Sequence, residues 1–124
     1  MVAGRSCDAR ATRYHYVVAR EDLPLGTLIA QIVHAAGESS PGDLDPGTFA
    51  VVLAARNEAH LLELAAELRR HQVAHKLIEE PDPPWHGAAM AIGLVPAYNR
   101  KLIQRVLGRL PLLRRCAGDL AISA

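Results

Sequence analysis

Hydrophobic and polar positions along the chain follow two periods, one typical of strands and one typical of helices. Short apolar runs between polar segments predict four strands, near residues 14–20, 49–54, 74–79 and 88–94. Apolar residues three and four apart predict three helices, near residues 26–38, 57–71 and 97–107. The order of these elements predicts an α/β fold, with a small four-stranded mixed sheet flanked by three helices.

The helical period also predicts which side chains each helix buries. For the first helix, the expected buried face is Leu28, Ile29, Ile32, Val33 and Ala36. For the second helix, which Asn57 is expected to cap, the inner face is Leu61, Leu64, Ala65 and Leu68. The apolar residues at helical spacing in the third helix are Leu102, Ile103, Val106, Leu107 and Leu110.

A polar stripe is predicted on the opposite side of the first helix. Thr27, Gln31, His34 and Glu38 are three or four residues apart and would therefore share one side of a helix. Exposed helix faces usually carry Lys and Glu, whereas this stripe offers a hydroxyl, an amide and an imidazole. These groups can donate and accept hydrogen bonds, and an imidazole can also titrate near neutral pH. The stripe is either a functional surface or an ordinary exposed face in which Thr27 caps the helix.

Length and composition describe one globular domain. The chain has 124 residues, of which 50% are hydrophobic and 22% are charged, enough to bury a core. We expect residues 1–13 to be a loose leader and residues 14–124 to form the domain. No apolar run approaches the roughly 18 residues of a membrane span. Cys7 and Cys116 are too isolated for a disulfide framework or a cysteine metal site, and the expected compartment is the cytoplasm.

Charge is distributed unevenly, although the formal net charge is only +1. Residues 83–118 contain no acidic residue but six of the 14 Lys and Arg residues. On the third helix, Lys101, Arg105 and Arg109 are spaced by four residues and predict a basic stripe. Arg100 and Arg114 are expected at the rim of this stripe. The stripe either binds an anion such as nucleic acid or only solvates a terminal helix.

Familiar catalytic motifs are absent from the sequence, including a phosphate-binding loop, a nucleophile elbow and a metalloprotease histidine pair. His71 and His75 are four residues apart, but a helix-to-strand change is expected between them, so no metal site is predicted. No cofactor is predicted either. Glu79 and Glu80 should point to opposite faces where the third strand ends, and one of them could face the polar stripe. Trp85 lies in a proline-rich loop and either plugs the sheet edge or stacks on a base.

Two stretches together resemble the class II peptidyl-tRNA hydrolases of archaea and eukaryotes. The first runs from Tyr16 to Leu23 and continues through Gly26, Ala30-Gln31 and His34-Ala35-Ala36, and the second is Ala91-Ile92-Gly93. The resemblance covers about residues 14–115. It looks closest to a divergent subgroup, the peptidyl-tRNA hydrolase domain-containing proteins, whose further pattern matches Leu64-Ala65-x-x-Leu68, His75 and Glu79-x-Pro81.

The resemblance implies a four-stranded mixed sheet, often a homodimer, with tRNA or peptidyl-tRNA as the partner. The implied reaction is hydrolysis of the ester between peptide and tRNA. By position, Gln31 matches the family's active-site glutamine and His34 matches its motif histidine. Thr27, however, stands where active members have a functional lysine.

The loop before the last strand departs from the family as well. The family's Asp and two Thr fall, counted without gaps, on Lys76, Glu80 and Ala88. Glu79 or Glu80 would then have to replace the lost carboxylate. These departures leave three alternatives open: an ester hydrolase, a non-catalytic tRNA- or protein-binding module on the same fold, and another acyl transfer from aminoacyl-tRNA.

For the hydrolase, the candidate residues divide into two sets. The candidate catalytic residues are Thr27, Gln31, His34, Glu79 and Glu80. The candidate tRNA-binding residues are Arg100, Lys101, Arg105 and Arg109.

Overall fold

The structure of the protein is a computed structural model, which describes residues 12–114. Most of the predicted leader and the segment after Arg114, with Arg115 and Cys116, lie outside these residues. The elements are β1 (Tyr14–Arg20), α2 (Leu25–Ser39), β2 (Phe49–Ala55), α3 (Glu58–Arg70), β3 (His75–Glu80), β4 (Ala88–Leu94) and α4 (Lys101–Leu107). This is the predicted α/β fold, and six of the seven elements begin and end within one residue of the prediction.

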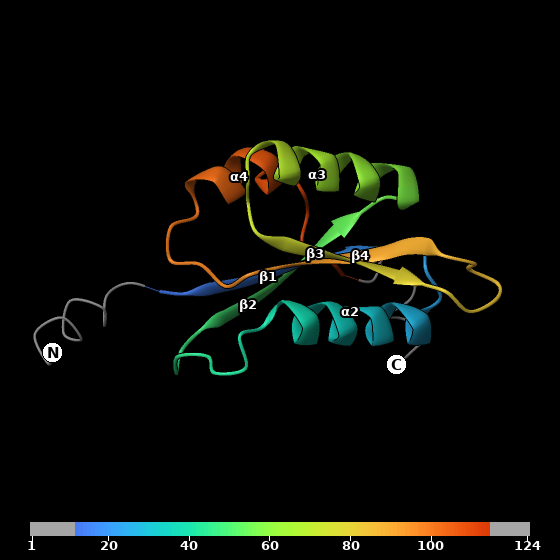
Figure 1. The fold of residues 1–124 in the computed structure, drawn as a ribbon, viewed down its shortest axis with the longest axis horizontal. Helices are drawn as coiled ribbons and strands as arrows, with labels where there is room; N and C mark the ends of the chain where they lie inside the picture. The colour runs from blue at the N-terminus through green and yellow to red at the C-terminus, as the bar shows by residue number, and fades with distance from the viewer. Residues whose placement is uncertain (1–11, 115–124) are drawn as a thin grey trace, which may run out of the picture.

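The four strands form one mixed sheet in the order β2-β1-β4-β3. β1 and β2 are parallel, and β4 is antiparallel to both of its neighbours. One face of the sheet is covered by α2 and the other by α3 and α4 (Figure 1). Two apolar cores result, because alternate residues of each strand face opposite layers: Tyr16 and Val18 face α3 and α4, whereas Val17 and Ala19 face α2.

The predicted buried face of α2 is wrong in part. The buried residues are Leu28, Gln31, Ala35 and Ser39, whereas Ile29 and Val33 are exposed. The physical reason is a close approach to β4, since a Cβ on Gly93 would collide with the Ala35 carbonyl oxygen and the Ser39 hydroxyl. Only small residues fit at this seam, and the helix is therefore rotated so that its bulky β-branched residues point outward.

The polar stripe predicted on α2 is consequently divided between two environments. Gln31 is buried and Thr27 is partly buried, whereas His34 and Glu38 are exposed. Thr27 does not cap the helix either, because α2 begins at Leu25.

The third helix begins at Lys101, four residues later than predicted. Ala97 instead pairs with the start of β1: the Tyr14 amide donates to its carbonyl at 2.8 Å, and its amide donates to the Tyr14 carbonyl at 2.9 Å. The Asn99 side chain then accepts the Lys101 amide at 3.0 Å. Backbone pairing to the sheet therefore outweighed the helical periodicity of residues 97–100.

The second helix matches its prediction closely. Asn57 caps α3 by accepting the His60 amide at 2.9 Å, and the predicted inner face is buried. The outer edge of β2 is also covered, because the Ala54 amide donates to the Pro111 carbonyl and the Leu113 amide donates to the Val52 carbonyl, each at 2.9 Å.

Candidate functional site

One edge of the sheet gathers most of the candidate polar residues. β1, β2 and β3 all end there, and both α2 and α3 begin there. Ligands of open α/β sheets commonly bind outside the carboxyl ends of the strands. We use the name carboxyl-end site for Thr27, Gln31, Glu80 and Trp85.

A partly buried hydrogen bond joins α2 to the end of β3 at this site. The Gln31 amide nitrogen donates to a Glu80 carboxylate oxygen at 3.0 Å, and the Gln31 residue is only 4% exposed. The second Glu80 oxygen accepts the Asp82 amide at 3.3 Å. These two hydrogen bonds hold the Glu80 carboxylate in one orientation. Because Glu80 is only partly buried, it lies at the boundary between core and solvent.

The other three candidate catalytic residues are placed differently. Thr27 lies one helical turn before Gln31 on α2, whereas Glu79 is exposed at the end of β3. His34 is exposed and lines a surface depression on α2 together with Glu38 and Ala30. The structure therefore brings Gln31 and Glu80 together and leaves His34 and Glu79 apart from them.

Two side chains that no sequence pattern singled out, Arg20 and Glu58, organise the backbone beside the site. Arg20 forms a bidentate ion pair with Asp22, at 3.0 Å for each bond, and donates to the Ala89 carbonyl at 2.9 Å. Glu58 accepts the Ala89 amide at 2.8 Å. These side chains complete the hydrogen bonding of Ala89 beyond the end of the β1–β4 register, a role that no sequence motif signals.

Trp85 packs between the Arg20 side chain and the apolar core that lies between α2 and the sheet. It is partly buried among the residues of that core, and the Arg20 guanidinium lies 5.8 Å from its ring centre. Asp22 raises the pKa of Arg20 further through its hydrogen bond, so the arginine stays charged beside the ring. This position fits a hydrophobic plug at the sheet edge, one of the two predicted alternatives.

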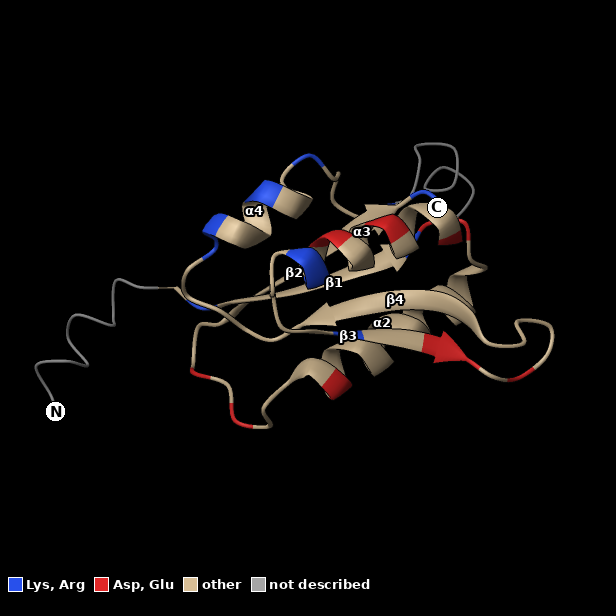
Figure 2. Ribbon diagram, turned by 45° about the horizontal axis from the view of Figure 1, so that its top comes forward, with Lys and Arg blue, Asp and Glu red and all other residues tan. Residues whose placement is uncertain are grey.

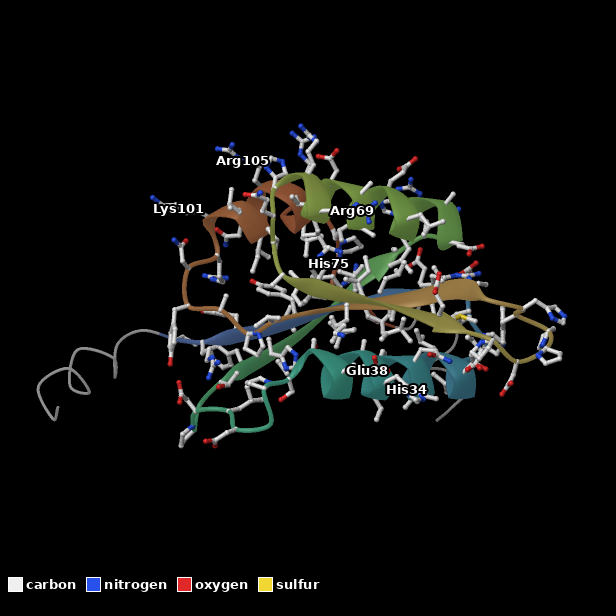
Figure 3. The ribbon with its side chains drawn as sticks, viewed as in Figure 1. His34, Glu38, Arg69, His75, Lys101 and Arg105 are labelled. Atoms are coloured by element: carbon white, nitrogen blue, oxygen red, sulfur yellow. The ribbon has the colours of Figure 1, made fainter. Side chains whose placement is uncertain are left out.

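The basic residues lie on the other side of the sheet. Lys101 and Arg105 are exposed on α4, and Arg109 is exposed just after it. Arg100 is less available, because its guanidinium lies 3.8 Å from the centre of the Tyr14 ring and donates to the Tyr16 hydroxyl at 3.0 Å. In Figure 3, Lys101, Arg105 and Arg69 lie in the layer opposite α2.

Charged residues are also unevenly placed, although α3 carries acidic as well as basic residues. Figure 2 shows acidic residues at the end of β3 and on the loop that follows it, and basic residues on α4 and at the C-terminal end of α3. Within residues 12–114, no group of three or more His, Cys, Asp or Glu side chains could hold a metal ion. In the same residues, no helix is long and apolar enough to cross a membrane.

Comparisons with known proteins show the fold and no more. No family model matches the chain, and no curated protein matches it. Among solved structures, it is similar to a protein of unknown function, Atu0240, from Agrobacterium tumefaciens strain C58. That structure superposes with a TM-score of 0.53 and is 16% identical, over 82% of this chain and 98% of the other.

Proposed function

We propose that this protein is a peptidyl-tRNA hydrolase-like enzyme that hydrolyses the ester between peptide and tRNA at the carboxyl-end site. The observation that carries the proposal is the hydrogen bond between Gln31 and Glu80. It joins the glutamine that the family resemblance marks as an active-site residue to a carboxylate that could replace the family's missing aspartate.

The chemistry assigned to these residues follows from their positions. Ester hydrolysis needs a base or an oriented water and a donor for the developing oxyanion. Glu80 is the base or the water-orienting group, because its carboxylate reaches solvent. Gln31 is too buried to touch a large substrate and acts by positioning Glu80, while the Thr27 hydroxyl is the donor on α2.

We expect turnover to be slow compared with that of lysine-bearing members of the resembled family. A cation beside the ester would stabilise the negative charge of the transition state. Thr27 supplies none, and Arg20 is already engaged by Asp22 and the Ala89 carbonyl.

Release of peptide from an N-acylated aminoacyl-tRNA tests the proposal directly. Glu80→Gln keeps the side-chain shape but removes the base, and should lower turnover about 100-fold or more. Glu79→Gln is the matched control, since it makes the same change at the adjacent exposed position, and should leave turnover unchanged. Equal turnover in the wild-type protein and Glu80→Gln would assign the chemistry to other residues.

The second candidate is a non-catalytic RNA-binding module on the same fold. The observation that favours it is the separation of the exposed basic residues of α4 from the carboxyl-end site by the whole sheet. Filter binding of tRNA distinguishes the two candidates: tight binding without release of peptide supports the module. The homodimer implied by the family resemblance remains a proposal in either case.

A further inference from the structure

A hollow of about 280 Å³ lies between the segment that joins α3 to β3 and the segment that leads from β4 into α4. Both helices lie over the same face of the sheet (Figure 1). β3 starts and β4 ends beside the hollow, so it lies at the opposite end of the sheet from the carboxyl-end site. We use the name α3–α4 pocket for this hollow, whose lining includes Gln72, Ala74, Val95, Asn99, Lys101 and Leu102.

Much of the lining is apolar and is not covered by the rest of the fold. Val95 and Leu102 are 42% and 45% exposed, and they meet the buried Ile103 in the pocket. The Val95 amide donates to the Ala74 carbonyl at 3.1 Å, so the backbone of the wall is already hydrogen-bonded. Exposed apolar side chains around a concave surface are typical of a ligand site.

Three side chains in the lining can donate hydrogen bonds to a ligand: Gln72, Asn99 and Lys101. The Asn99 side-chain oxygen accepts the Lys101 backbone amide at 3.0 Å, which leaves the Asn99 NH₂ group to donate. Within residues 12–114, the Lys101 ammonium group forms no ion pair. The polar part of the pocket therefore offers donors and one positive charge.

Gln72 occupies a backbone position that glycine adopts at lower cost. Its φ angle is 58°, and it comes directly after His71, which ends α3. A side chain held in the left-handed region is often associated with a functional site. Here the residue that accepts this cost places its amide in the pocket lining.

The charge around the pocket favours an anion. Both segments that form it lack acidic residues, since none occurs in residues 68–78 or in residues 83–118. The carbonyl groups at the end of α3 are also occupied: the Val73 amide donates to the Leu68 carbonyl and the Gln72 amide donates to the Arg69 carbonyl. The negative end of this helix is therefore capped rather than open to the pocket.

We propose that the α3–α4 pocket binds a small aliphatic carboxylate, a site that goes beyond the proposed hydrolase function and does not depend on it. The acyl chain lies against Val95, Leu102 and Ile103, and the carboxylate accepts from Lys101 and Asn99. A cavity of about 150 Å³ holds benzene, so the pocket accommodates about ten non-hydrogen atoms. Octanoate has this size.

Other small ligands complement the pocket less well. A nucleotide would bring a base, but the lining contains no aromatic side chain on which a base could stack. A neutral lipid would leave the Lys101 ammonium unpaired. A short acyl carboxylate uses both the apolar and the charged part of the lining.

Titration of the ¹⁵N-labelled full chain with octanoate, followed by NMR chemical shifts, tests the proposal. Saturable shifts are expected at the amides of Ala74, Val95 and Leu102, with a dissociation constant of about 100 µM for a ligand of this size. Octan-1-ol lacks the carboxylate and acetate lacks the chain. Each should therefore bind about tenfold more weakly or less.

Two variants change the pocket without touching its lysine. Ala74→Leu fills the hollow, and Leu102→Glu places a carboxylate beside the ligand, so each should weaken octanoate binding about tenfold or more. Ala66→Leu is the matched control for the first, because it makes the same change at an exposed alanine of α3 outside the lining. The NMR spectra establish that the variants are folded. If Ala74→Leu does not fold, Leu102→Glu, at an exposed position, still tests the pocket.

The positive charge is tested separately. Lys101→Gln should weaken octanoate binding about tenfold and leave octan-1-ol binding unchanged, because only the carboxylate needs the cation. Lys76→Gln is the matched control, an exposed lysine of β3 that does not line the pocket.

Three outcomes would overturn the proposal. The first is a set of shifts that do not saturate or that lie away from the pocket. The second is equal octanoate affinity in the wild-type protein, Ala74→Leu and Leu102→Glu. The third is adenosine monophosphate binding as tightly as octanoate, which would assign the pocket to a nucleotide. None of these outcomes depends on the release of peptide from tRNA.

Discussion

His15 shows how one buried polar residue fixes α2 against the sheet. It lies on β1 and is almost fully buried, and its Nε2 atom shares a hydrogen bond of 2.8 Å with the Ser39 hydroxyl. Ser39 in turn donates to the Ala35 carbonyl at 2.7 Å. Burial lowers the pKa of His15, and the nearby Arg13 lowers it further, so the folded state favours neutral imidazole.

This lowered pKa predicts a loss of stability in mild acid. As pH falls below about 6.5, the unfolded chain takes up a proton on His15 before the folded chain does. The contribution of His15 is therefore complete above the unfolded pKa and is lost as pH falls through the folded pKa. Urea unfolding between about pH 7.5 and 5.5 should show a smaller loss of unfolding free energy for His15→Gln than for the wild-type protein.

His86→Gln is the control for this prediction. His86 is exposed on the loop before β4, so its removal should leave the pH dependence unchanged. Equal pH dependence in the wild-type protein and His15→Gln would contradict the assignment to His15.

Among the secondary-structure elements, the seam between α2 and β4 determines how the first helix is oriented. Gly93 allows the helix backbone to approach at Ala35 and Ser39. This contact directs Gln31 toward Glu80 and leaves Ile29 and Val33 exposed. The candidate site and the exposed apolar face of α2 are thus two results of one close contact.

Gly93→Ala should therefore destabilise the fold. The new methyl group would collide with the backbone of α2, which cannot yield as a flexible side chain can, and we expect a loss of about 3 kcal/mol. Gly26→Ala, in the first turn of α2, meets open space and should be neutral or stabilising by about 0.5–1 kcal/mol. Denaturant unfolding measures both changes. A loss below about 1 kcal/mol for Gly93→Ala would show that the seam can relax.

At the scale of the whole molecule, the sheet separates α2, which carries Thr27 and Gln31, from the exposed basic residues of α4. Basic residues lie on α4 and at the C-terminal end of α3, α3 also carries acidic residues, and further acidic residues lie at the end of β3 and on the loop that follows it (Figure 2). An RNA attracted to the basic layer would have to pass around the sheet for its ester to reach Glu80. Binding and hydrolysis can therefore be tested separately.

Reversing the charge of the basic stripe should abolish tRNA binding. The triple variant Lys101→Glu, Arg105→Glu and Arg109→Glu changes only exposed side chains, so it should fold normally. Wild-type affinity should fall steeply with salt, because neutralised phosphates release counterions. The control is Arg56→Glu, an exposed arginine between β2 and α3. Unchanged binding by the triple variant would direct attention to Arg5, Arg10 and Arg13 instead.

The sequence by itself determined the order and type of the elements. The hydrophobic periodicity, the proline-rich loops and the Asn57 cap are local signals. They predicted the bounds of six elements to within one residue. The late start of α4 was not predictable in this way, because Ala97 pairs with Tyr14, a residue distant in the sequence. The sequence also pointed to Gln31 and to Glu79 or Glu80 without deciding between the two carboxylates.

The tertiary structure alone decided which side of each element faces its neighbours. The apolar period of α2 allowed more than one rotation, and only the contact with Gly93 selected the one that buries Gln31. Likewise, Arg100 is part of a basic stripe in the sequence but stacks on Tyr14 in the fold. Local sequence patterns reflect the preferences of neighbouring residues for helix, strand or turn. A close approach between backbones that are distant in the sequence depends instead on contacts that form only when the sheet and its two helical layers assemble.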